Sequence, residues 1–71
     1  MKKYAVDIDL SNGKQIREFE VDSLLKSIKY FDKYSENMMY ENTIIDNIQL
    51  IEITKQGYIV LNSKFYESNN D

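Results

Sequence analysis

Hydrophobic and polar residues alternate along the first ten residues in the way that is typical of a half-buried β-strand. The apolar positions are Tyr4, Val6, Ile8 and Leu10. Asn12-Gly13 follows, and this dipeptide favours a type I′ turn because both residues tolerate a positive φ. We therefore expect a hairpin whose second strand runs over residues 14–21.

The register of this hairpin depends on the length of its loop. A two-residue loop pairs Val6 with Phe19 and Tyr4 with Val21, whereas a three-residue loop places Val6 opposite Glu18. Because the first arrangement keeps apolar residues opposite one another, the pattern favours the two-residue loop.

A helical repeat follows the hairpin, over about residues 22–35. Asp22 or Ser23 can cap the helix, and Leu24, Ile28 and Phe31 form a stripe with Leu25 at its edge, which should pack on the sheet. The opposite side carries Lys26, Lys29 and Lys33, and Tyr30 and Tyr34 lie at the boundary between the two sides.

Isoleucines occupy both odd and even positions over residues 44–54, as expected of a strand that is buried on two faces or carries a bulge. Gly57 at the left-handed position of a three-residue loop would pair Ile53 with Ile59 and Ile51 with Leu61. A two-residue loop that pairs Ile51 with Asn62 fits the pattern less well. Residues 35–43 are interpreted as a connector or a frayed extension of the helix.

These elements predict an α+β domain with the order ββαββ, in which one helix packs on a four-stranded, mainly antiparallel sheet. The domain would occupy residues 1–66, with the two hairpins in strand order 2-1-3-4. Residues 67–71 are polar, and we expect them to form a disordered tail.

The amino-acid composition excludes several types of catalytic and metal site. The 71 residues include no cysteine and no histidine, so the usual zinc sites, a thiolate nucleophile and an imidazole base are excluded. A domain of this size also has little room for an enclosed pocket, and we expect no enzymatic activity, no metal site and no cofactor. The N-terminal residues contain no apolar run of signal-peptide or membrane-spanning length, so the chain is interpreted as cytoplasmic without a membrane partner.

The net charge of −3 has the wrong sign for a domain that neutralises phosphates, which argues against direct nucleic-acid binding. The three helix lysines remain the weaker alternative for such binding. If Val6 and Phe19 face the helix, a row of carboxylates projects from the other face, with Asp7 opposite Glu18 at a cost in stability. This acidic face comprises Asp7, Asp9, Glu18 and Glu20. It is either an ordinary solvated face or a binding site for a basic protein partner.

A second candidate surface lies on the second hairpin, on the face away from the helix. Its residues are Ile48, Leu50, Tyr58 and Val60. An exposed apolar cluster of this kind indicates an interface, and a small domain gains burial by pairing with a second copy, so we expect a homodimer. The alternatives are that residues 35–43 cover this face as a lid or that a different protein binds it.

In its size, acidity and richness in residues with AT-rich codons, the chain resembles short accessory proteins encoded by phages and mobile elements, some of which are DNA-mimicking inhibitors. No motif carries this resemblance, and no residue role follows from it. Together with the acidic face, it predicts a small, non-enzymatic protein-binding module that inhibits a nucleic-acid-handling protein. The alternative is a structural or regulatory homodimer without a foreign partner.

Overall fold

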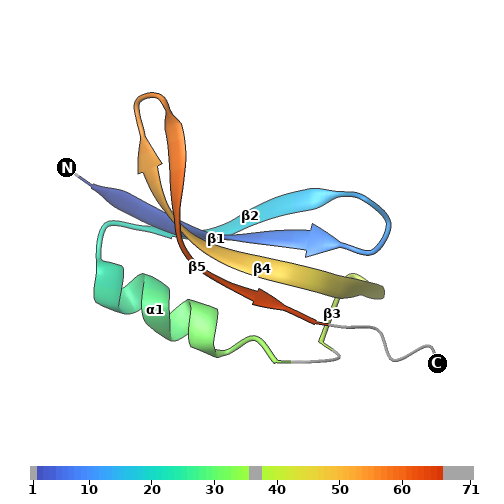
Figure 1. The fold of residues 1–71 in the computed structure, drawn as a ribbon. Helices are drawn as coiled ribbons and strands as arrows, with labels where there is room; N and C mark the ends of the chain where they lie inside the picture. Colours follow the sequence, from blue (N-terminus) through green and yellow to red (C-terminus); the bar gives the residue numbers. More distant parts are fainter. Residues whose placement is uncertain (1, 36–37, 67–71) are drawn as a thin grey trace.

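The computed structural model describes residues 2–35 and 38–66. The chain forms β1 (Lys3–Leu10), β2 (Gln15–Val21), α1 (Leu24–Asp32), β3 (Met39–Tyr40), β4 (Thr43–Thr54) and β5 (Gly57–Phe65). The helix packs on one face of an antiparallel sheet (Figure 1), which confirms the predicted α+β fold with its ββαββ order. The short strand β3 is an addition within the predicted connector. The tail predicted at residues 67–71 lies outside the described residues.

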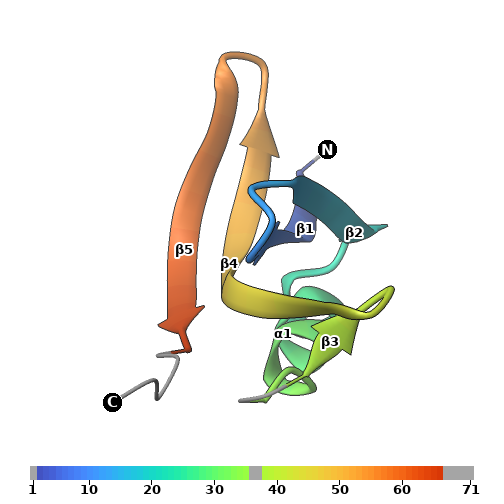
Figure 2. The same ribbon diagram turned by 90° about the vertical axis from the view of Figure 1, so that its right-hand side faces the viewer.

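The four long strands lie in the order β2-β1-β4-β5, which is the predicted order of the two hairpins. The short strand β3 pairs with the first residues of β4, before β4 meets its longer neighbours. Strands β2 and β5 are therefore the two outer strands of the sheet, on opposite sides of the β1–β4 pair (Figure 2). The helix found among the described residues is too short to cross a membrane.

The first hairpin differs from its predicted register near the turn. The amide of Gly13 donates to the carbonyl of Leu10 at 3.0 Å, and the amide of Leu10 donates to the carbonyl of Lys14 at 2.8 Å. These bonds close a three-residue loop, with Gly13 at a φ of 90° that suits glycine. Val6 consequently lies opposite Glu18, and the predicted two-residue loop is wrong.

A β-bulge then restores the predicted pairing at the far end of this hairpin. The register shifts between Tyr4 and Val6, so that Tyr4 lies opposite Val21 as predicted. Phe19 lies in the shifted segment of β2 with a φ of 56°, a left-handed conformation that is uncommon for a bulky residue.

The second hairpin shows the converse arrangement. Its loop has two residues, because Thr54 lies opposite Gly57, and the predicted three-residue loop is wrong. Leu61 of β5 forms a bulge, because its neighbours Val60 and Asn62 lie opposite Ile51 and Leu50, and the register shifts there by one residue. Ile51 consequently lies opposite Val60 and Ile53 opposite Tyr58, so the two predicted pairs, with Leu61 and Ile59, are wrong. Beyond the bulge Leu50 lies opposite Asn62, which is the offset that a three-residue loop would have given.

The main core lies between the sheet and α1. Ile8 of β1 pairs with Ile48 of β4, and Val6 pairs with Leu50, so these side chains share the face that packs on the helix. Ile51 of β4 is also buried, but it points away from the helix. Strand β4 is therefore buried on both faces, as the isoleucines at its odd and even positions predicted.

The helix uses a different stripe from the predicted one. Ser27 and Phe31 are its buried residues, whereas Leu24 and Ile28 remain partly exposed. A small serine lets the helix approach the sheet closely, and its hydroxyl donates to the carbonyl of Leu24 at 2.7 Å, so no polar group is buried unpaired there. Ser23 caps the N-terminus as one of the two predicted caps, accepting from the amide of Lys26 at 3.3 Å.

Lys64 of β5 caps the C-terminal end of the helix. Its ammonium donates to the carbonyls of Phe31 and Tyr34 at 3.2 and 3.4 Å, and it lies 3.9 Å from the carboxylate of Asp32. The carbonyl of Phe31 also accepts from the amide of Tyr34 at 3.3 Å, so Lys64 is a second donor there, and a cation is favourable at the negative end of the helix dipole.

Candidate protein-binding surfaces

The predicted acidic face is divided between the two sides of the sheet. Asp7 lies opposite Arg17, not Glu18, because of the three-residue loop in the first hairpin. Glu18 pairs with Val6, so it projects on the helix side, where it accepts a hydrogen bond from the Tyr34 hydroxyl at 3.1 Å. The prediction that Asp7 and Glu18 face each other on one surface is therefore wrong.

Asp7 is also neutralised within the chain. Its carboxylate is only 2% exposed and accepts from Nε and Nη2 of Arg17 at 2.8 and 3.2 Å. This two-point bond raises the pKa of the guanidinium above its ordinary value. Asp7 is therefore a structural residue of β1, and its charge is not displayed.

The remaining members of the predicted acidic face are more accessible. Glu20 lies 3.7 Å from the ammonium of Lys3 in an exposed pair, and Asp9 is half-buried opposite Gln15. Whether Asp9, Glu18 and Glu20 bind a basic partner stays a prediction, but they do not form the continuous row of four carboxylates that motivated it.

The predicted apolar interface is likewise divided. Ile48 and Leu50 are 0% and 4% exposed and belong to the core against α1, so their predicted position on an outer face is wrong. The error follows from the β1–β4 register, which pairs them with Ile8 and Val6. Tyr58 and Val60 are exposed as predicted.

Strand β5 carries an apolar surface larger than the predicted one. Its large apolar residues are 43–71% exposed. They are Tyr58, Ile59, Val60, Leu61 and Phe65. In the described part of the chain β5 pairs with β4 alone, so the backbone groups along its other side are available for hydrogen bonding. We call this free side, together with these five side chains, the β5 edge.

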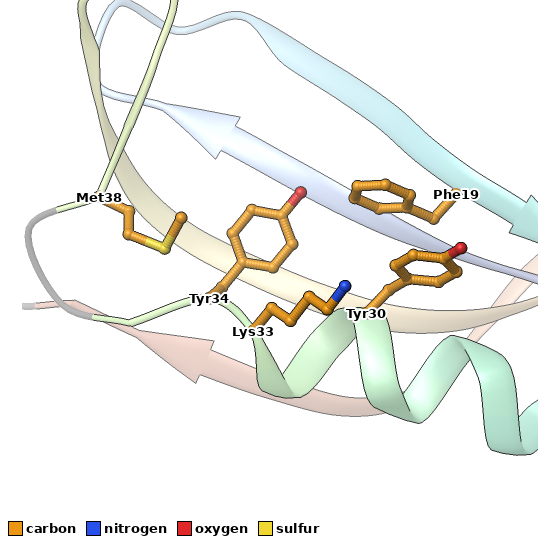
Figure 3. A pocket seen from close by; sticks show the side chains of 5 residues that line it. All are labelled: Phe19, Tyr30, Lys33, Tyr34 and Met38. Carbon is orange, nitrogen blue, oxygen red and sulfur yellow. The ribbon is translucent and has the colours of Figure 1, made fainter.

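A separate apolar pocket of about 170 Å³ lies between β2, α1 and the segment that follows the helix (Figure 3). The ring of Phe19 stacks on Tyr30 with centroids 4.2 Å apart and planes 6° from parallel. Tyr34 approaches Phe19 edge-on at 6.3 Å. Met38 and the alkyl chain of Lys33 complete the lining.

Two features fix the aromatic side chains of this pocket. The left-handed backbone at Phe19 directs its ring onto the helix side, and the hydroxyl of Tyr34 is held by Glu18. Burial, and after it the hydrogen bond to Glu18, raise the pKa of the Tyr34 hydroxyl above its ordinary value. The Tyr34 hydroxyl is therefore neutral at physiological pH and donates the hydrogen bond to the carboxylate of Glu18.

A basic hollow of about 310 Å³ adjoins this pocket along α1. It is lined by Val21, Lys26, Lys29, Tyr30 and Lys33, and it shares Tyr30 and Lys33 with the apolar pocket. Sequence patterns placed the three lysines on one helix side and the tyrosines at its boundary. They also placed Phe19 on the helix side of the sheet, as the structure does, but through a direct pairing with Val6. The bulge that in fact turns Phe19 toward the helix leaves no periodic signal.

Comparison with known proteins adds no assignment: no protein-family model, curated protein or solved structure matches the chain.

Proposed function

We propose that this protein is a non-enzymatic protein-interaction module that associates with a second copy of itself through the β5 edge. The observation that carries the proposal is the exposure of five large apolar side chains on one outer strand. Monomeric proteins rarely leave so much apolar surface exposed on one element, and an outer strand whose middle carries no charge is a template for further β-pairing.

The charge distribution along β5 supports edge-to-edge pairing. Lys64 is the one charged residue of the strand, and its ammonium is engaged at the end of α1. Two copies of β5 can therefore approach without placing like charges against each other.

A second copy is the occupant that fits best. An antiparallel pairing of two identical strands has two-fold symmetry, so the apolar stretch from Tyr58 to Leu61 would lie against its own counterpart. Nine residues extend over about 30 Å, which is long enough for an interface of the size found in stable dimers. A small domain also gains from the additional burial.

The proposal is tested by measuring the mass in solution, by sedimentation equilibrium, from micromolar to near-millimolar concentration. We expect the wild-type chain to approach twice its 8.5 kDa mass, with little dependence on salt because the contact is apolar. Ile59→Lys places a charge in the interface and should yield monomers. Gln15→Lys adds the same charge on the other outer strand and should leave the dimer intact.

A wild-type chain that stays at 8.5 kDa across this range would contradict the proposal. Equal dissociation by Ile59→Lys and Gln15→Lys would also contradict it, because it would show that net charge and not the β5 edge controls association.

A further inference from the structure

The apolar pocket and the basic hollow form one groove along β2 and α1. Tyr30 and Lys33 line both, so a ligand that fills one can continue into the other. The groove lies along β2, and β2 and β5 are on opposite sides of the β1–β4 pair. Binding of a ligand to the groove can therefore be measured independently of the dimer.

The apolar end of the groove is rigid before any ligand binds. Phe19 is stacked on Tyr30, and Tyr34 is fixed by its hydrogen bond to Glu18, so these rings lose little conformational freedom on binding. Phe19 nevertheless remains 39% exposed, and Met38 contributes an adaptable thioether side chain at the opening. A volume of about 170 Å³ is suited to one large aliphatic side chain.

The lysines at the basic end form no ion pair within the described part of the chain, although the ammonium of Lys33 lies 5.2 Å from the ring centroid of Tyr30. Each of four other cations lies within 4.0 Å of a carboxylate: Lys2, Lys3, Arg17 and Lys64. Among the residues that the structure describes, Lys26, Lys29 and Lys33 have no such partner. Three ammonium groups along one helix side therefore form a local positive field on an acidic protein.

We propose that this groove binds an acidic peptide segment of another protein that carries one large aliphatic residue. The aliphatic side chain enters the pocket between Phe19, Tyr34 and Met38. Carboxylates of the same segment lie along Lys26, Lys29 and Lys33, where they meet the positive field. The apolar contact supplies most of the affinity, and the charges select the partner and speed its approach.

A single-stranded nucleic acid fits the groove less well. The ring of Tyr30 is already stacked on Phe19, and the ammonium of Lys33 lies 5.2 Å from its centroid, which leaves little of the ring for a nucleobase. The lining of the apolar pocket also offers few donors or acceptors for base edges.

The test is a nuclear magnetic resonance titration of the full ¹⁵N-labelled chain with a synthetic peptide of Asp, Glu, Gly and Ser that contains one central Leu. We expect saturable shifts at the amides of Phe19, Tyr30 and Lys33. Replacing the Leu by Ser, or the acidic residues by Lys, should weaken binding by about tenfold or more. An oligothymidine of similar length should bind more weakly than the acidic Leu peptide.

Matched variants separate the local field from net charge. Lys29→Glu with Lys33→Glu should weaken binding of the peptide by about tenfold or more, whereas Lys14→Glu with Lys55→Glu, in the two hairpin loops, should change it by less than about twofold. Met38→Ser should weaken binding without altering the rest of the spectrum. Ile59→Lys should leave binding unchanged, because the β5 edge is not part of the groove.

Three results would overturn the proposal: the absence of saturable shifts, equal binding of the Leu and Ser peptides, or equal weakening by the two charge-reversal pairs. Tighter binding of oligothymidine than of the acidic peptide would overturn it in favour of a nucleic-acid groove.

Discussion

The two outer strands of the sheet present opposite chemistry. Both strands carry a bulge, but β2 also carries three charged residues, and its Phe19 ring stacks on the helix. Strand β5 is longer, and its exposed middle is uncharged and apolar. Charges on an outer strand oppose pairing with another strand. Strand β2 therefore makes its side-chain contacts within the molecule, whereas the apolar side chains of β5 stay exposed, as the proposed pairing with a second copy requires.

The largest expected effect comes from breaking the ion pair that anchors β2. Arg17→Met leaves the buried carboxylate of Asp7 without its two donors and should lower the free energy of unfolding by about 2–3 kcal/mol, less than for a fully buried pair because Arg17 is partly exposed. Urea unfolding measures the change. Lys3→Met, which removes an exposed pair, should cost less than about 0.5 kcal/mol. Equal losses in the two variants would show that Arg17 does not anchor the strand.

The next effect concerns the left-handed residue Phe19 at the bulge of β2. At a φ of 56° glycine is unstrained and alanine is not, so Phe19→Gly should be more stable than Phe19→Ala by about 0.5–1 kcal/mol. At Ile16, in the regular part of the same strand, alanine should be more stable than glycine. Thermal unfolding of the four variants gives both differences, and the same order at both positions would argue against backbone strain at Phe19.

Tyr34 links β2 to the helix, and Tyr34→Phe should cost up to about 1 kcal/mol at neutral pH through loss of the bond to Glu18. The raised pKa of Tyr34 also has a defined consequence at alkaline pH. Below a pH of about 10 the hydroxyl is neutral in both states, and its contribution is fully present. Above that pH the unfolded chain ionises first, so stability falls.

The variant should therefore show a shallower alkaline loss of stability than the wild type. Circular dichroism melts between neutral pH and strong alkali measure this slope. Parallel slopes for the wild type and Tyr34→Phe would contradict the assignment of the loss to Tyr34.

The smallest effect on the fold is expected from protecting β5. Ile59→Lys should change the unfolding free energy of the monomer by less than about 0.5 kcal/mol, because the residue is half exposed. It should, however, remove the dependence of the melting temperature on protein concentration that a dimer confers. A wild-type melting temperature that is independent of concentration would contradict the contrast between the two edges.

The sequence was sufficient to predict the elements and their order, because strand alternation, the Ser23 cap and the two glycine-containing turns are local signals. The hairpin registers could not be predicted in full. In the first hairpin the apolar pattern indicated the register far from the turn, where Tyr4 meets Val21. In the second hairpin neither predicted pair is present, because Ile51 meets Val60 and Ile53 meets Tyr58. A bulge in each hairpin separates the register at the turn from the register at the far end, so the loop length alone does not determine both.

The errors in register affected the predicted sites more than the predicted elements, because a shift of one residue moves a side chain to the other face of the sheet. Because Ile48 pairs with Ile8, Ile48 and Leu50 of the expected interface lie in the core. Because Asp7 pairs with Arg17, its charge is neutralised and does not contribute to the acidic face. Which strand of one hairpin meets the other, and in which register, depends on contacts distant in sequence, which no local pattern records.

The position of Lys64 has a consequence for folding during synthesis. A helix of nine residues is too short to be stable alone, and the carbonyls of Phe31 and Tyr34 at its C-terminal end find this partner 33 and 30 residues later in the chain. The end of the helix therefore stays unfinished while the ribosome adds β4 and most of β5. Strand β5 both completes the helix and creates the apolar edge, so a chain can offer that edge to a second copy only after the preceding elements have been made.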